Sequence, residues 1–109
     1  MPWLVAEDHV VASLELADTR ATRRRGLLGR DGIEGALWLS PARSVHTIGM
    51  RFPIDVAHVD ADMTVLSVVT MAPGRVGRWR CRARHVIEAE AGSLRRWGIE
   101  PGVTVEVRS

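Results

Sequence analysis

Short segments with a strand-like pattern follow one another at close, regular spacing along most of the chain. In the clearest of them, VTVEVR (103–108), Val103, Val105 and Val107 share one face of the expected strand. Seven further segments have a similar character: 3–7, 10–16, 35–40, 56–60, 64–71, 78–84 and 85–90. DADM (60–63) is expected to turn a hairpin. The spacing predicts a mainly β (α+β) fold, either a β-sandwich or a partly closed barrel of seven to eight short strands.

Two short helices complete the expected fold. Asp18 precedes TRATRRRGLLGR, and Asp is a good helix N-cap, so we expect a helix at about 19–28. Ser93 is expected to cap a second helix over LRRW, which ends at Gly98. Two helices are too few for a fold built from α/β crossover units.

The length of 109 residues fits one small domain, and we expect residues 1–109 to form it. No apolar run approaches the roughly 18–20 residues that cross a bilayer. The first residues lack the basic and apolar regions of a signal peptide. Cys81 is the only cysteine and cannot form an internal disulfide, which agrees with a reducing compartment. We therefore expect a cytoplasmic protein with no membrane partner.

All 15 basic residues are arginines, and two groups of them stand out along the chain. The groups are Arg20, Arg23, Arg24 and Arg25, and then Arg75, Arg78, Arg80, Arg82 and Arg84. If 78–85 is a strand, its four arginines line one face, and Trp79 and Cys81 pack on the other. Guanidinium groups suit phosphate and carboxylate oxygens, so this ladder, together with Arg24, is a candidate anion-binding surface. The alternative is a solvated edge strand whose charges block aggregation or pair with acids in the fold.

The motif HTIGMRFPID (46–55) is the second candidate site. His46 could act as a base or a metal ligand, and Asp55 could orient it. In the alternative, the glycine and proline of the motif fix the backbone, and Asp55 accepts backbone N–H bonds within a turn. We expect His46, Thr47, Met50 and Asp55 to form or support a small pocket.

The sequence offers little for a metal or a cofactor. No two of the four histidines have close ligand spacing, and a second cysteine for a thiolate site is lacking. DAD (60–62) lacks the further acidic positions and the glycine of a calcium loop. We therefore predict no metal and no cofactor.

Four segments, taken in order, resemble one known family. They are ATRRRGLLGR (21–30), HTIGMRFPIDVAHVDAD (46–62), HVIEAEAGSLRRWGI (85–99) and EPGVTVEV (100–107). They are similar to the basic helix, the central signature, the Leu-Glu and Ala-Gly stretch, and the closing turn and strand of the DUF192 family. This family comprises small bacterial and archaeal domains of uncharacterised function. The resemblance implies a mainly β fold and no particular reaction.

The central signature departs from the commoner family pattern. That pattern has Trp-Met-x-Asn-Thr before Pro-Leu-Asp, whereas residues 46–50 here read His-Thr-Ile-Gly-Met before Pro53, Ile54 and Asp55. A role of the family's Asn or Thr side chain therefore does not carry over to this chain.

The sequence favours a small binding or accessory module with an arginine-rich, anion-attracting face. Its partner would be an anionic ligand, a nucleic acid or an acidic protein. One alternative is a small hydrolase-like enzyme that uses His46 and Asp55 as base and orienter. Another is a structural protein-interaction module.

Overall fold

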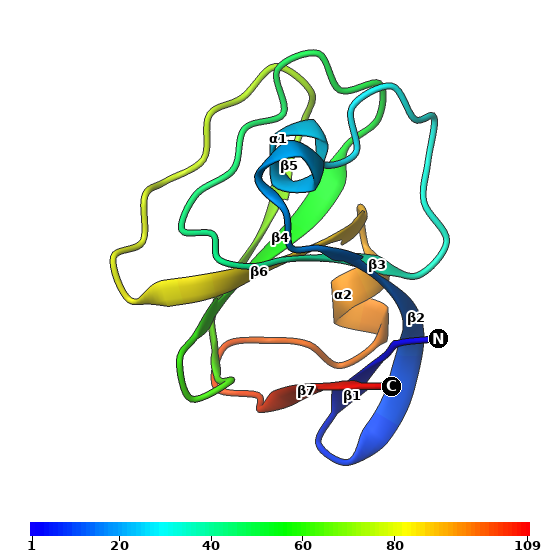
Figure 1. Ribbon diagram of the computed structural model, residues 1–109, viewed down its shortest axis with the longest axis vertical. Coiled ribbons are helices and arrows are strands. Elements are labelled where there is room, and N and C mark those ends of the chain that lie inside the picture. Colours follow the sequence, from blue (N-terminus) through cyan, green and yellow to red (C-terminus); the bar gives the residue numbers. More distant parts are fainter.

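Seven strands form one mixed sheet in the computed structural model, which describes residues 1–109 (Figure 1). The strands are β1 (Trp3–Ala6), β2 (His9–Ala17), β3 (Ala36–Leu39), β4 (Ile54–Asp60), β5 (Val65–Met71), β6 (Ala83–Glu90) and β7 (Val105–Arg108). Their order across the sheet is β5-β4-β6-β3-β2-β1-β7. All neighbours are antiparallel except β2 and β3, which are parallel and are joined through the helix α1 (Arg20–Arg25). The second helix, α2 (Ser93–Arg96), follows β6. The predicted mainly β fold with two short helices is confirmed.

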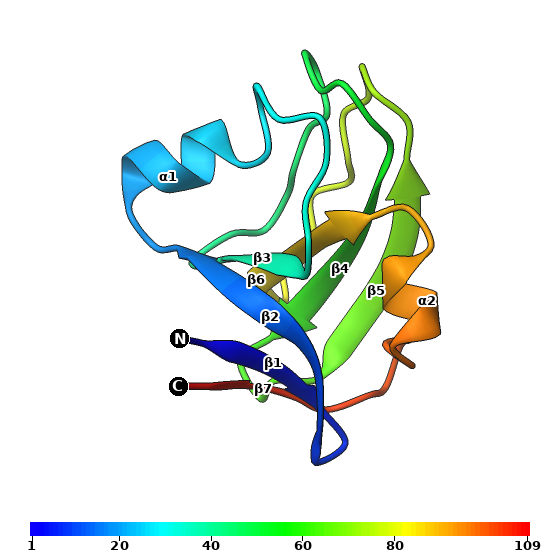
Figure 2. The ribbon, with the colours of Figure 1, turned by 90° about the vertical axis from the view of Figure 1, so that its right-hand side faces the viewer.

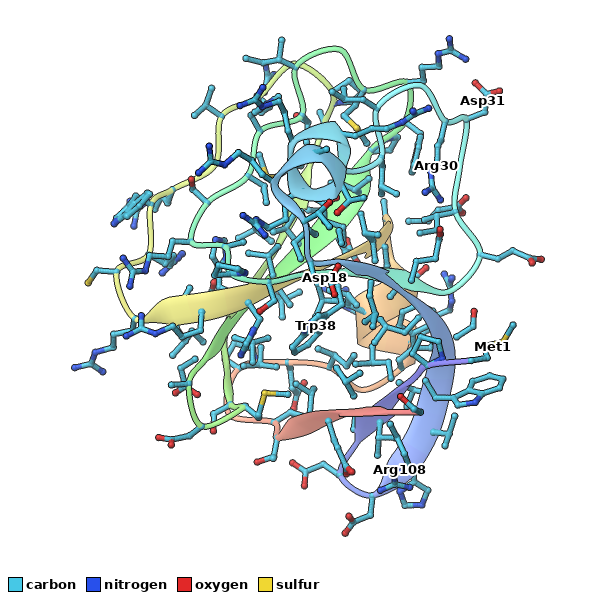
Figure 3. All side chains as sticks on the ribbon, viewed as in Figure 1. Met1, Asp18, Arg30, Asp31, Trp38 and Arg108 are labelled. Atoms are coloured by element: carbon cyan, nitrogen blue, oxygen red, sulfur yellow. The ribbon has the colours of Figure 1, made fainter.

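The sheet bends sharply at β2, because this strand pairs with different neighbours along its length. Its first part, His9–Ser13, pairs with β1, whereas Leu14–Ala17 pairs with β3. The two parts of the sheet consequently face each other across a shared core (Figure 2). This core contains Leu4, Ala6, Leu14, Ala36, Trp38, Ala57, Val59, Val65, Ile87, Ala89, Leu94, Ile99 and Val105. Figure 3 shows Trp38 between the two parts.

The two edges of the sheet meet at one end only. Thr64, before β5, forms an isolated bridge with Thr104, before β7. The N–H of Val65 donates to the carbonyl of Val103 at 2.8 Å. The sheet is therefore joined at one end but is not closed into a barrel, and it is not a sandwich of two separate sheets.

The opposite face of β3, β4 and β6 is covered by α1 and the long connections of the chain. A second apolar cluster lies there and contains Ala17, Leu27, Leu37, Leu39, Met50, Ile54, Val56, Met71 and Val86. Because β4 has a core on each face, all its residues from Ile54 to Val59 are buried. In both ribbon views α1 and the connections 26–35, 40–53 and 72–82 gather at one end of the molecule (Figures 1 and 2). This end holds the candidate sites.

Both helices begin and end differently from the prediction. The N-cap of α1 is Thr19 and not Asp18, because Thr19 and Thr22 form a reciprocal capping box in which each hydroxyl accepts the other's backbone N–H. This helix stops at Arg25, since Gly26 has a φ of 49°. For α2 the cap is Gly92, and Ser93 is the first helical residue. Neither helix is long and apolar enough to span a membrane.

The predicted arginine ladder is wrong. Residues 78–80 lie outside any strand, Cys81 and Arg82 form a turn, and β6 starts only at Ala83. The turn is closed by the N–H of Ala83, which donates to the carbonyl of Arg80 at 3.0 Å. Because this turn breaks the alternation, the arginines do not share a strand face, and Trp79 and Cys81 are both exposed. An arginine-rich anion-attracting face is therefore not supported.

Candidate functional site

Two segments of the long connections run antiparallel beside each other at the loop end of the molecule. The N–H groups of Thr47, Gly77 and Arg80 donate to the carbonyls of Arg75, Val45 and Arg43 at 2.7, 2.8 and 3.0 Å. His46 and Val76 form an isolated bridge between the same segments. We call residues 43–47 together with 75–80 the loop ribbon. One of its segments lines a pocket beside α1, and the other lines a larger pocket beside β5.

Thr47 fixes the loop ribbon from within. Its side chain is fully buried, and its hydroxyl donates to the carbonyl of Ala72 at 2.6 Å while accepting from the N–H of Arg75 at 2.9 Å. Thr47 lines neither pocket. Its contribution is therefore to support the walls of both pockets by holding the connection 72–75 against residues 46–47.

The pocket beside α1 has a volume of about 150 Å³. Its walls come from the end of α1 and the following turn (residues 23–28), Leu39, the ribbon residues 44–46, and Met50. The remaining lining residue is Glu88, near the centre of β6. We call this cavity the Glu88 pocket. His46 and Met50, both predicted to form a pocket, thus lie around one cavity.

Glu88 is the unusual residue of this pocket. It is paired across the sheet with Leu37 of β3 and Val56 of β4, so apolar side chains flank it, and it is only 5% exposed. None of the hydrogen bonds or ion pairs of the structure involves its carboxyl group. Burial of this group raises the pKa of Glu88 to about 7. The carboxyl group can therefore gain or lose a proton close to neutral pH.

The turn after α1 reaches close to Glu88. A Cβ atom at Gly26 would lie 3.5 Å from a carboxyl oxygen of Glu88, and the positive φ of Gly26 disfavours any other residue there. The backbone of this turn thus lies within van der Waals reach of the carboxyl group, and the positive φ, not a lack of space, favours glycine there. The exposed side chains of Arg24 and Arg25 also line the pocket and make it electropositive.

The predicted dyad of His46 and Asp55 is not formed. Asp55 alternates with Ile54 and Val56 along β4 and therefore points to the opposite face of the sheet, towards α2. There its carboxylate accepts hydrogen bonds from the hydroxyl of Thr70 and from the N–H groups of Gly92 and Leu94. His46 is exposed, and its Nδ1 accepts only from the N–H of Ile48, at 3.3 Å. Asp55 thus caps α2 and cannot orient His46.

The five arginines predicted to bind anions are distributed over different places. Arg24 lines the Glu88 pocket, whereas Arg78 and Arg80 line the larger pocket beside β5. Arg82 and Arg84 line neither. The fold does not bring these five side chains to one surface.

Sequence reasoning missed Glu88 and His58, which are the two buried titratable residues facing the loop end. Each has an available signal, since each is a single polar residue inside an otherwise apolar stretch of strand, VIEA and VAHV. Alternation places Glu88 on the face of Val86, and His58 on the face of Val56. The sequence pattern does not show which segments of the chain cover this face of the sheet. No three His, Cys, Asp or Glu side chains gather in a group that could hold a metal ion.

The fold and these two pockets define a small mainly β domain with a cavity on each side of a loop ribbon. Residues 4–107 match the family model of DUF192, described as "Uncharacterized ACR", and the chain belongs to this family. A curated relative is a UPF0127 protein of Pyrococcus abyssi, 29% identical over 98 residues, which are 85% of this chain and 84% of that protein.

Two solved structures share the fold. A protein of unknown function from Novosphingobium aromaticivorans has a TM-score of 0.78 and 23% identity, over 96% of this chain and 82% of that one. A protein from Sinorhizobium meliloti, for which a role as a transcription regulator has been suggested, has a TM-score of 0.80 and 19% identity. That match covers 97% of this chain and 91% of the other. At these identities the likeness concerns the fold alone.

Proposed function

We propose that residues 1–109 act as a small-molecule-binding domain whose ligand occupies the Glu88 pocket and donates a hydrogen bond to Glu88. The proposal rests on Glu88, which is only 5% exposed and lines the pocket, and whose carboxyl group has no hydrogen-bond partner in the protein. The buried side-chain atoms that lack a partner are His58 Nε2 and Arg80 Nε, and the oxygens of Glu88 are not among them, so these oxygens are accessible from the pocket. A ligand in the pocket can therefore donate a hydrogen bond to them.

The lining of the pocket restricts the chemistry of the ligand. Leu27, Leu28 and Met50 offer an apolar wall, whereas Arg24 and Arg25 place positive charge beside it. A cationic amine would meet these guanidinium groups at close range, so a neutral donor is favoured over an ammonium group. We infer a small ligand with a hydroxyl or amide group and an apolar part.

Acid–base catalysis is a second candidate function, favoured by the presence of His46 and Glu88 around the same cavity. An acid or base works best when its pKa lies near the working pH, as burial arranges for Glu88. In this version Glu88 takes the place that the sequence suggested for Asp55. A time course with 4-nitrophenyl acetate at pH 7 tests it, because Glu88→Gln and His46→Gln must each slow hydrolysis to the background rate.

The binding proposal is tested with a matched pair of probes, acetamide and acetone. They have similar size, but only acetamide has N–H donors. ¹³C NMR follows the side-chain carboxyl signal of Glu88 as the pH is varied. The pH midpoint of this signal is compared with and without each probe. Acetamide must lower this midpoint, since a donor stabilises the ionised carboxylate, and acetone must not.

Amide chemical shifts and two variants provide further measurements that control the probe experiment. Amide signals of His46 and Met50 are expected to move with acetamide in the native protein and in Glu90→Gln, but not in Glu88→Met. Glu90 lies on the same strand and is exposed, so its variant controls for a general loss of charge. If acetamide leaves the midpoint of Glu88 unchanged, the proposed function is wrong.

A cytoplasmic location belongs with this proposal. It is supported by the single cysteine, Cys81, whose thiol is free and exposed. Cell fractionation followed by thiol labelling tests it, and recovery of the protein outside the cytoplasmic fraction would contradict it.

A further inference from the structure

A second pocket lies on the other side of the loop ribbon, between the ribbon and the strands β4 and β5. Its volume is about 570 Å³, which is within the range of small-molecule sites. His58 of β4 lines it, together with Arg75, Arg78 and Arg80 of the ribbon. Val69 and Met71 of β5 supply an apolar wall. We call this cavity the His58 pocket.

The charges around the His58 pocket are unbalanced. Three of its lining residues are arginines, and none is an aspartate or glutamate. The ion pairs of the structure are Arg30–Glu15, Arg51–Asp31 and Arg108–Glu106, so Arg75, Arg78 and Arg80 all lack a carboxylate partner. Guanidinium groups gathered around one cavity repel each other, and a bound anion relieves that repulsion.

Two nitrogen atoms beside this pocket are buried without a hydrogen-bond partner. They are Nε2 of His58 and Nε of Arg80. The His58 side chain is only 2% exposed, and its other nitrogen, Nδ1, lies 3.4 Å from the hydroxyl oxygen of Ser67. Buried groups of this kind are rare in folded proteins and call for a partner.

The surroundings of His58 favour its neutral form. Burial lowers the pKa of this imidazole, and the charge of Arg80 lowers it further, while the backbone carbonyl of Arg43 acts in the opposite direction. A neutral imidazole whose Nδ1 accepts from Ser67 carries its proton on Nε2. That proton then adds a donor beside the guanidinium groups.

We propose that the His58 pocket binds a small organic anion. Its phosphate or carboxylate oxygens accept hydrogen bonds from Arg80 and His58, and its apolar part packs against Val69 and Met71. The site differs from the arginine face expected from the sequence, because it is a cavity and because it excludes Arg82 and Arg84. It is also separate from the Glu88 pocket, on whose role it does not depend.

Calorimetric titration with three probes tests the proposal. Phenyl phosphate and benzoate combine an aromatic body with an oxyanion, and benzyl alcohol carries a similar body without charge. We expect at least one anion to bind ten-fold or more tightly than benzyl alcohol. The stronger of the two anions identifies whether phosphate or carboxylate is preferred.

Arginine variants separate this cavity from general attraction to a basic protein. Arg80→Gln and Arg78→Gln are each expected to weaken binding of the better anion at least ten-fold, whereas Arg82→Gln leaves it within two-fold. Arg82 is the matched control, because it removes the same charge from the same connection outside the pocket. Arg78 is exposed, so its variant keeps the test valid even if Arg80→Gln fails to fold. Equal weakening by all three variants, or anions no tighter than benzyl alcohol, would overturn the proposal.

Discussion

The carboxylate of Asp55 accepts a hydrogen bond of 3.1 Å from the backbone N–H of Leu94, 39 residues further along the chain. The same oxygen accepts from the N–H of Gly92 at 2.9 Å, and the other oxygen accepts from the hydroxyl of Thr70 at 2.7 Å. The last residue of HTIGMRFPID thus joins β4 to the start of α2 and to β5. Its role is in stability and not in chemistry at the loop end.

Replacing Asp55 should therefore destabilise the fold strongly. Asp55→Ala leaves two N–H groups at the start of α2 without an acceptor, and we expect a loss of about 3 kcal/mol in the free energy of unfolding. Urea denaturation measures it. Thr70→Val removes a single donor to the same carboxylate and should cost only about 1 kcal/mol. A loss for Asp55→Ala no larger than that for Thr70→Val would contradict the capping role.

Glu88 should make stability depend on pH in a particular direction. Because its pKa is raised from 4.5 to about 7 by burial, the folded state holds this proton more tightly than the unfolded state. The contribution of this bound proton to the free energy of unfolding is fully present below about pH 4.5. It is lost as the pH rises through 7, and the total loss is about 3 kcal/mol. Glu88→Gln removes this loss, so its stability relative to the native protein should increase from pH 5 to pH 8.

The control for this measurement is Glu90→Gln, on the same strand. Glu90 is exposed, so its variant should follow the pH dependence of the native protein. Urea midpoints at several pH values decide between the two outcomes. Parallel curves for the native protein and Glu88→Gln would show that the carboxyl group of Glu88 is already well solvated.

Thr47 offers a test of how the loop ribbon is held. Thr47→Val keeps the shape of the side chain but removes the hydroxyl that bonds to Ala72 and Arg75, and should cost about 1–3 kcal/mol. Thr47→Ser keeps the hydroxyl and should cost less. Thermal unfolding compares them, and a larger loss for Thr47→Ser than for Thr47→Val would mean that the methyl group, and not the hydroxyl, stabilises the ribbon.

The two segments of the loop ribbon approach each other closely at Gly77, whose N–H donates to the carbonyl of Val45 at 2.8 Å. A Cβ atom there would lie 2.8 Å from the carbonyl oxygen of Val45, so Gly77→Ala must push the segments apart. We expect a destabilisation of about 1–2 kcal/mol and altered amide signals around both pockets. The neighbouring Val76→Ala, at an exposed position, should change little. If the NMR spectra of Gly77→Ala and Val76→Ala differ from the native spectrum equally little, the two segments are not in close contact at Gly77.

The strands were predictable because their signal is local. Alternation over 103–108 and the DADM turn both depend on residues that are neighbours in the sequence. The cap of α1 was misplaced by one residue, because Asp18 and Thr19 are both good capping types, and only the reciprocal bond to Thr22 favours Thr19. Errors of this kind leave the architecture unchanged.

The candidate site was less predictable, because it depends on contacts between distant segments. The alternation of arginines over 78–84 is typical of a strand, but the backbone of this segment turns at Cys81 and Arg82. The backbone N–H of Arg80 donates a hydrogen bond to the carbonyl of Arg43, which is far away in the sequence. Likewise, nothing near Glu88 in the sequence says that the turn after α1 covers it. Burial of a polar residue on a strand is decided by the covering segment and not by the strand.

The pairing of the first and last strands has a mechanical consequence. Trp3, at the start of β1, lies opposite Arg108, at the end of β7, so both ends of the chain leave the sheet at the same point (Figures 1 and 2). A force applied to the two ends therefore loads the hydrogen bonds between β1 and β7 one after another instead of all together. The domain should peel open at its terminal strand under a weak pull, and Val105 would be the first core side chain to reach water.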